Sequence, residues 1–317
     1  MRSSNGSVQA GLTNSSTTLE QLKTLDTIKT YVFLGAFLVT GLLTCLILVT
    51  VFGTRALKQK SYYILLCQHC ACVTGFNVVG VMLHGLRVRQ VTVPRLVCWL
   101  IFDVQVALGR CLVITLTLMA INVSLSVCCP LHYRELRRRG CCAMLMAWIV
   151  ALLNPVLFTI LACVQSPWEN VVVPDTLCST ALDGFAARVS SLALLCLLSL
   201  LFIVSYVAIC VEGCKAGHFS GSNKKAQRTI CIHTLQLSLH ILPAFIIIAR
   251  VPLDLTGSIV NFLMLLVAQS ISPFVYGLRC YDIWSRLPMF LPQFLLPLWN
   301  WCDWSMSKTL AAPASCL

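Results

Sequence analysis

One arginine lies in the middle of a long apolar stretch. Arg110 stands twelve residues after Cys98 in a run from about 97 to 127, and Asp103 precedes it by seven residues. On a helix this spacing places the two charges on one face, about 10.5 Å apart along the axis. A charge at the centre of a membrane helix costs about 2.5 to 3.5 kcal/mol, so Arg110 is a candidate functional group.

Two roles are open for Arg110. In the first, its guanidinium attracts an acidic or strongly polar group of a ligand, and aliphatic neighbours bury the ligand's hydrocarbon part. The candidate ligand contacts on this face are Asp103, Val106, Ala107, Arg110 and Ile114. In the second, Arg110 is structural and bonds helix carbonyls or Asp103. Ligand binding that survives Arg110→Ala with unchanged preference would remove the first role.

A second polar stripe follows later in the chain. His233, Gln236 and His240 stand at i, i+3 and i+7 of an apolar run. Two helical turns separate the histidines by about 10.5 Å, too far for one metal ion with bonds near 2 Å. We expect hydrogen-bonded interior groups and no metal, with His240 as a further ligand contact. Since no catalytic set lies at working spacing within a run, we expect neither an enzyme nor a cofactor.

The composition says what surrounds these residues. Of 317 residues, 58% are apolar and 11% are charged, and the mean hydropathy is +0.85. Soluble domains carry about 25% charged residues, so this chain belongs in lipid. The net charge of +12 comes from short basic runs between apolar stretches. This distribution argues against a nucleic-acid partner and for membrane lipid.

Seven apolar runs are each long enough to cross a bilayer. They are continuous rather than alternating, which favours helices over strands. The sequence therefore predicts an all-α membrane protein with a seven-transmembrane helix bundle. No internal repeat supports a transporter. The runs cover about 31–53, 62–83, 97–127, 141–164, 189–211, 229–249 and 257–278.

Charges in the loops predict the orientation. With the N-terminus outside, fourteen Lys and Arg face the cytosol and eight face outward, as the positive-inside rule favours. Asn5 and Asn14 each begin a glycosylation acceptor. We therefore expect a plasma-membrane protein with three parts. These are an extracellular glycosylated tail (1–30), a receptor domain (31–279) and a cytoplasmic tail (280–317) with an interfacial apolar segment at 287–301.

Four motifs, in order along the runs, resemble odorant receptors of the rhodopsin-like (class A) G-protein-coupled receptor family. The third run ends in Met119-Ala-Ile-Asn-Val-Ser-Leu-Ser-Val-Cys-Cys-Pro-Leu-His-Tyr133, similar to Met-Ala-Tyr-Asp-Arg-Tyr-Val-Ala-Ile-Cys followed by Pro-Leu-X-Tyr. Ser272-Pro-Phe-Val-Tyr-Gly-Leu-Arg279 resembles Asn-Pro-X-Ile-Tyr-X-Leu-Arg. Lys225-Ala-Gln-Arg-Thr-Ile-Cys-Ile-His233 and Ser205-Tyr206 match two further motifs. The resemblance covers roughly residues 30 to 280 and is strongest to fish-type odorant receptors.

The resemblance implies a ligand, a partner and a disulfide. A small organic odorant would bind between the third, fifth, sixth and seventh helices, and a heterotrimeric G-protein would couple to the inner side. The family's cysteine at the outer end of the third helix falls on Cys98, and its partner would be Cys178; two free thiols are the alternative. Cys280 is either a palmitoylation site or an unmodified thiol.

The chain also departs from the family pattern. Asn122, Val123 and Ser124 stand where the family has Asp-Arg-Tyr, so the arginine that the family uses toward the G-protein is absent. The family's polar positions in the first, second and seventh helices fall on Thr44, Val73 and Ser272. The switch residues Tyr206, Pro273 and Tyr276 remain. These substitutions place efficient G-protein activation in doubt.

Three functions therefore stay open. The first is a chemosensory receptor that signals through a G-protein. The second is a decoy, chaperone or degenerate receptor that has the bundle without the signalling. The third, a small channel or transporter, has the least support because the runs lack repeats and intramembrane acids other than Asp103.

Overall fold

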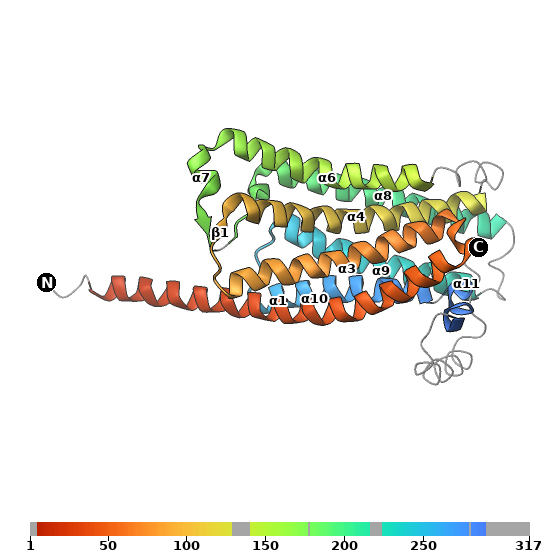
Figure 1. The fold of residues 1–317 in the computed structure, drawn as a ribbon, viewed down its shortest axis with the longest axis horizontal. Coiled ribbons are helices and arrows are strands. Elements are labelled where there is room, and N and C mark those ends of the chain that lie inside the picture. The colour runs from red at the N-terminus through yellow and green to blue at the C-terminus, as the bar shows by residue number, and fades with distance from the viewer. Residues whose placement is uncertain (1–4, 129–139, 177, 216–223, 279, 290–317) are drawn as a thin grey trace.

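The computed structural model describes residues 5–128, 140–176, 178–215, 224–278 and 280–289. Long helices run side by side along the long axis of the molecule (Figure 1). Each predicted apolar run lies on one of them, and the last run continues from α10 into η3, a π-helix over Pro273–Leu278. The long helices are α1 (Asn5–Gly53), α3 (Ser61–Val88), α4 (Arg95–Cys128), α6 (Gly140–Gln165), α8 (Phe185–Lys215), α9 (Lys224–Ala249) and α10 (Leu255–Ser272).

Six of these helices are long and apolar enough, within the described residues, to cross a bilayer. In α9 the side chains are described from Thr234 onward, and this apolar part covers Thr234–Ala249. The prediction of an all-α membrane bundle is confirmed.

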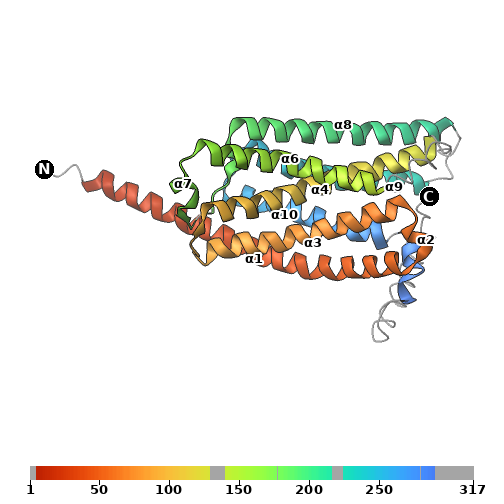
Figure 2. The same ribbon diagram turned by 45° about the horizontal axis from the view of Figure 1, so that its top comes forward.

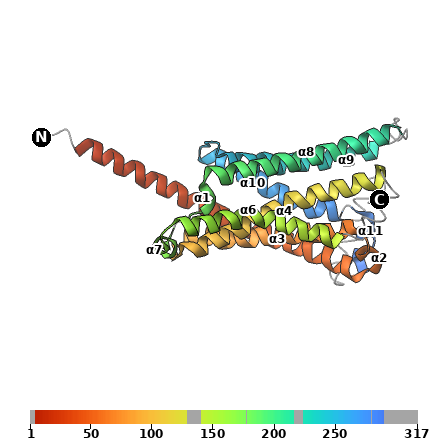
Figure 3. The ribbon, with the colours of Figure 1, turned by 90° about the horizontal axis from the view of Figure 1, so that it is seen from above.

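The order of packing makes α4 the central helix. It contacts α3, α6 and α8, while α1 packs on α3 and α10, and α9 packs on α8 and α10. Figures 2 and 3 show α4 between the other helices from two further directions. The contact of α1 with α3 depends on a small residue: a Cβ at Gly80 would lie 2.7 Å from the Phe33 ring. Ridges this close leave no room for even a methyl group.

Short elements mark the two ends of the bundle. One end, here called the β end, carries a two-stranded antiparallel sheet in which Val93 pairs with Asp175. The opposite end, here called the α11 end, carries two short helices and a 3-10 turn. The short elements at the β end are β1 (Val93–Pro94), α7 (Trp168–Val172), β2 (Pro174–Asp175) and η2 (Ala181–Asp183). Those at the α11 end are α2 (Arg55–Lys58), α11 (Tyr281–Trp284) and η4 (Leu287–Met289).

The first helix begins earlier than the sequence predicts. Helix α1 runs without a break through residue 30, where we expected a tail to end. Its threonines bond back to carbonyls one turn earlier, as Thr27 does to Lys23 at 2.7 Å, so the polar composition does not interrupt the helix. Asp26 is buried and bonds Nδ1 of His84 at 2.8 Å. The bundle therefore includes part of the segment predicted as a tail.

Two predictions fall on residues of which little is described. The side chains of Asn5 and Asn14 lie outside the described residues, so glycosylation stays a prediction. The predicted interfacial segment at 287–301 is described as far as 289, where Leu287 is buried and Met289 is exposed.

Candidate ligand-binding cavity

A cavity of about 340 Å³ lies among α4, α8, α9 and α10 near the β end, with η2 beside it. These are the third, fifth, sixth and seventh long helices, the ones between which the resemblance implies a ligand. Its volume falls in the range of roughly 300 to 1,000 Å³ in which small-molecule pockets lie. The fold therefore encloses a space suited to a small organic molecule.

Aliphatic side chains form most of the cavity wall, and a few polar groups interrupt it. Leu194, Leu195 and Leu198 follow one face of α8, and Ala244, Ile247 and Ile248 follow α9. This combination of an apolar wall with few polar groups is typical of a site that orients a small ligand. The charged and polar lining residues include Arg110, Asp183, Arg188, His240, Arg250 and Gln269.

The structure brings together half of the predicted ligand contacts. Val106, Arg110 and His240 line the cavity. Ala107 and Ile114 are buried but lie outside its lining. Viewed down the helix axis, they lie about 40° to 60° to one side of Arg110, whereas Val106 and Val113, which line the cavity, lie about as far to the other side.

Arg110 has a mixed role. Its Nη2 atom donates to Asn154 Oδ1 at 2.6 Å and to Ser191 Oγ at 2.5 Å, which ties α4 to α6 and α8. Its Nη1 atom is buried and has no hydrogen-bond partner. The guanidinium is therefore held by the helices and still has a donor to offer.

Asp103 takes neither of its expected partners. It lies outside the cavity lining, is 4% exposed, and forms no ion pair with Arg110 within the described residues. Neither carboxylate oxygen has a hydrogen-bond partner of ordinary geometry there, and Thr159 of α6 is the neighbouring donor that acts on it. Asp103 and Arg110 are spaced along the helix axis as expected, but the carboxylate and the guanidinium do not come into contact.

His240 connects the cavity to the π-helix. Its Nδ1 atom lies 3.1 Å from the carbonyl oxygen of Gln236. Because a carbonyl oxygen accepts only, this bond assigns the proton to Nδ1 and leaves Nε2 as a buried acceptor without a partner. Gln236 in turn donates to Ser272 Oγ at 2.5 Å. Ser272 directly precedes Pro273, where α10 becomes a π-helix.

The predicted stripe on α9 thus faces the bundle at two of its three positions. Gln236 and His240 are buried, whereas the side chain of His233 lies outside the described residues.

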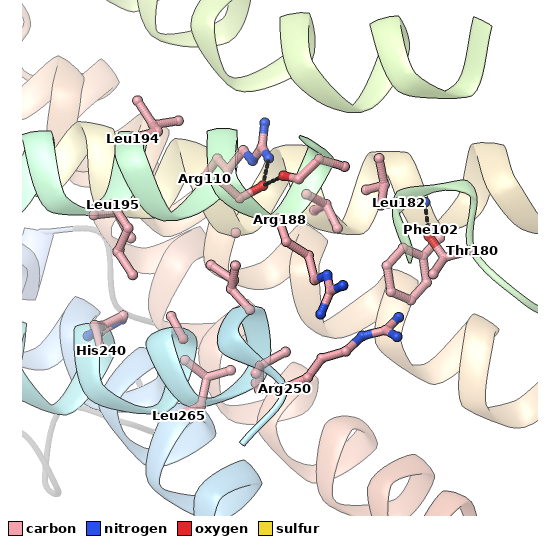
Figure 4. A pocket seen from close by; sticks show the side chains of 18 of the residues that line it. Phe102, Arg110, Thr180, Leu182, Arg188, Leu194, Leu195, His240, Arg250 and Leu265 are labelled. Atoms are coloured by element: carbon pink, nitrogen blue, oxygen red, sulfur yellow. Dashed lines mark hydrogen bonds between the residues drawn. The ribbon is translucent and has the colours of Figure 1, made fainter. Parts of the chain in front are cut away.

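Sequence inspection missed three charged lining residues. Arg188 begins the first turns of α8, and Arg250 follows the last residue of α9 and bonds Asp183 of η2. Figure 4 shows Arg188 and Arg250 extending toward the same end of the cavity, with Phe102 beside them. Arg188 and Arg250 are two of the eight basic residues that the charge bias places on the outer side. Their position at span ends was the available signal, but it does not say which way a side chain turns.

A disulfide lies at the β end and precedes the cavity-lining Thr180 and Leu182 in the chain. Cys98 of α4 is bonded to Cys178, with Cα atoms 5.1 Å apart. Both cysteines are buried, and Arg87 of α3 donates to the Cys178 carbonyl at 2.8 Å. The segment between α7 and α8 is thereby fixed over the helix ends. The pairing implied by the resemblance is the one that the structure contains.

The predicted switch residues lie toward the α11 end. Val123 packs against the apolar cluster that includes Leu66, Leu116 and Met119. Asn122 Nδ2 is buried without a partner, and Ser124 Oγ lies 3.9 Å from Cys128 Sγ. No charge stands at the position of the family's arginine, so packing fills this level of the bundle.

The retained aromatic residues are also part of this apolar region. Tyr206 stacks on Phe202 with ring centroids 4.5 Å apart. Tyr276 is buried in η3, and its ring lies edge-on to His69. Pro273 has no N–H to donate, which accommodates the change from α-helix to π-helix at this point.

The substituted polar positions bond within the bundle. Thr44 donates to the Cys70 carbonyl at 3.1 Å and lies 2.9 Å from Thr74 Oγ1, while Val73 is fully buried. These positions therefore join α1 to α3 directly.

Beyond the π-helix, α11 is held against α3. Lys60 Nζ and Tyr63 OH both donate to Asp282 Oδ2, at 2.9 and 2.7 Å. Cys280 is fully buried, with its Sγ 3.3 Å from Tyr63 OH. In this arrangement the Cys280 thiol does not face a lipid, so its palmitoylation stays a prediction without support from the structure.

Comparison with known proteins identifies related chains. No protein family profile matches the sequence. Mouse (Mus musculus) "Olfactory receptor 4B13" is 25% identical over 275 residues, covering 81% of this chain and 88% of the mouse protein. Dog (Canis lupus familiaris) "Olfactory receptor-like protein OLF4" is 23% identical, covering 81% and 89%. Human (Homo sapiens) "Olfactory receptor 6J1" is 24% identical, covering 80% of each chain.

These relatives are receptors rather than enzymes, and the likeness extends over most of both chains. It agrees with the motifs, the seven-helix bundle and the cavity. The chain is a multi-pass membrane protein homologous to the olfactory receptors of class A.

Proposed function

We propose that this protein is a chemosensory receptor that binds a small organic ligand in the cavity among α4, α8, α9 and α10. The observation that carries the proposal is the cavity itself, because an apolar wall meets a few buried polar atoms without partners there. The olfactory receptor relatives support the same function. The fish-type subdivision stays a prediction.

The signal would leave the cavity through α9 and α10. Ligand contact with His240 acts on a helix whose next polar residue, Gln236, bonds Ser272 at the start of the π-helix. A ligand that fits one arrangement of these helices better than another shifts the equilibrium between them. The partner on the α11 end would be a heterotrimeric G-protein.

The proposal includes an orientation. The β end would face outside the plasma membrane, with the N-terminus extracellular, because this side carries the disulfide and fewer basic residues. Protease applied to sealed cells should cleave the N-terminal segment and spare the segment after Cys129. The opposite pattern would invert the topology and remove the chemosensory assignment.

The test of signalling is an odorant-evoked cAMP assay in cells that express the full chain, with surface labelling as the expression control. Val123→Arg restores the charge that the family pattern has. We expect a ligand-dependent response in the original chain and a larger one in Val123→Arg. Ligand binding with no response in either chain would contradict the G-protein part of the proposal.

A second candidate is a receptor-like protein without efficient coupling, such as a decoy. It is favoured by one observation, namely that Val123 is part of the apolar packing where a charged residue would contact the G-protein. A response that appears in Val123→Arg and is absent in the original chain would favour this candidate.

A further inference from the structure

We infer that the cavity selects small organic anions, specifically monocarboxylates with an aliphatic body. This inference deepens the proposed function and rests on it. The inference is based on the charges of the lining, which contains three arginines, Arg110, Arg188 and Arg250, and one carboxylate, Asp183. Arginine stays protonated in proteins, so the lining holds an excess of two positive charges.

Arg188 is the principal anchor. It forms no ion pair within the described part of the chain, and its Nε atom is buried without a hydrogen-bond partner. A guanidinium binds a carboxylate through two parallel N–H···O bonds, which supply both charge and direction. A carboxylate in front of Arg188 would satisfy the unpaired donor and neutralise the charge in one contact.

The other two arginines are each partly compensated. Arg250 bonds Asp183. Arg110 donates to Asn154 and Ser191, and Asp103 is near enough to act on it electrostatically although it forms no ion pair. These two side chains therefore strengthen the positive potential at the β end, while Arg188 is left to meet the ligand.

The apolar wall accounts for the rest of the ligand. From Arg188 to Leu198, helix α8 rises about 15 Å at 1.5 Å per residue. Leucines line the far part of this distance, from Leu194 to Leu198. Figure 4 shows Arg188 and Arg250 at one end of the cavity and His240 with Leu195 toward the other, with Arg110 between them. A carboxylate bound at Arg188 would direct its hydrocarbon chain along these leucines, where burial is favourable.

Asp183 sets a limit on affinity. It is the one acid in the lining, its side chain is half exposed, and it forms an ion pair with Arg250. Removing its charge would release Arg250 for the ligand and remove a repulsion of the incoming anion. The inference therefore predicts a variant that binds more tightly than the original chain.

The experiment measures direct binding to the purified full chain in phosphatidylcholine nanodiscs. Radiolabelled octanoate is the probe, and straight-chain acids from butyrate to decanoate compete with it, each beside its matched amide, alcohol and amine. We expect the acids to compete better than all three matched compounds. Equal competition by amide and acid, or no binding across the series, would overturn the inference.

Two variants and a control locate the anchor. Arg188→Gln should weaken octanoate binding about tenfold to a hundredfold, the usual effect of losing a hydrogen bond to a charged group. Asp183→Asn should tighten it about twofold to fivefold. Arg89→Gln removes an exposed charge near the end of α3, outside the lining, and should leave binding unchanged.

Thermal unfolding of each variant separates misfolding from loss of the anchor. If Arg188→Gln does not fold, the test is the tighter octanoate binding expected of Asp183→Asn. Unchanged or weaker binding in Asp183→Asn would then overturn the inference. The cAMP assay separates this inference from the proposed function. Octanoate binding without a cAMP response would support the inference and contradict signalling. A cAMP response to octanol and octanamide but not to octanoate would support signalling and contradict the inference.

Discussion

At the β end of the bundle three arginines and one aspartate surround a cavity, whereas at the α11 end the same helices meet in a continuous apolar cluster. Arg188 has no ion-pair partner among the described residues, but Lys60 of the α11 end is paired with Asp282. The buried Tyr276 belongs to this cluster, and Val123, which stands at the position of the family's arginine, packs against it.

The difference separates two physical tasks within one set of helices. Two buried donors without partners, Arg110 Nη1 and Arg188 Nε, belong to the cavity lining. Each such donor destabilises a fold by about 1 to 3 kcal/mol, and a ligand or water bound in the cavity would offset this cost. Apolar packing at the other end contributes stability and, being dense, responds as a unit to helix movement. Under the proposed function, binding specificity and conformational response would therefore be located in different halves.

Loss of the disulfide should have the largest effect. Cys98→Ser releases the segment that covers the β end and is expected to reduce stability by about 2 to 4 kcal/mol. Thermal unfolding in nanodiscs measures this change, and octanoate binding should fall with it. Cys196→Ser, which alters an exposed free cysteine of α8, is the control. Equal unfolding temperatures for the two variants would show that the bridge does not hold the cavity.

The second largest effect should come from adding a methyl group at the close contact of α1 and α3. Gly80→Ala places a Cβ within 2.7 Å of the Phe33 ring, and overpacking of this kind costs about 1 to 3 kcal/mol. Gly85→Ala lies on the same helix with nothing within 4 Å and should be neutral or slightly stabilising. If thermal unfolding ranks the two alike, the helices are not packed as closely as the structure places them.

A substitution at the junction of the two halves should alter the cAMP response without altering ligand binding. Gln236→Leu removes the hydrogen bond to Ser272, an interaction that contributes about 0.6 kcal/mol in membrane bundles. We expect octanoate affinity within about twofold of the original and a shifted cAMP concentration curve. A large loss of affinity with an unchanged response would contradict the division between the halves.

The smallest effect should come from the ion pair that holds α11. Burial raises the pKa of Asp282, but hydrogen bonds from Lys60 and Tyr63 outweigh it and hold the pKa below its ordinary value. The pair therefore stabilises the fold above the unfolded pKa of about 3.9, and this contribution disappears as pH falls through the lower folded pKa.

Asp282→Asn should cost about 0.2 to 1 kcal/mol at neutral pH, because the pair is partly exposed. Unfolding measured at neutral pH and in acid should show the difference between Asp282→Asn and the original chain shrinking in acid. A difference that persists unchanged at low pH would mean that the charge of Asp282 does not act here.

Much of the fold could be predicted from the sequence, since seven apolar runs in lipid leave helices as the available structure. The start of α1 could not, because the burial of Asp26 depends on His84, fifty-eight residues away. For the site, Val106, Arg110 and His240 were found from charge and periodicity, whereas Asp103, Ala107 and Ile114 share the helix but not the cavity.

The sequence by itself determined the solvent and the number of long helices, because hydropathy is a property of single segments. The resemblance implied the pair Cys98 and Cys178, and the structure contains that bond. Tertiary structure alone decided that Arg188, Arg250 and Asp183 meet at one cavity, since they come from α8, the segment after α9, and η2. Which side chains converge depends on the rotation and tilt of each helix against its neighbours, and packing sets both.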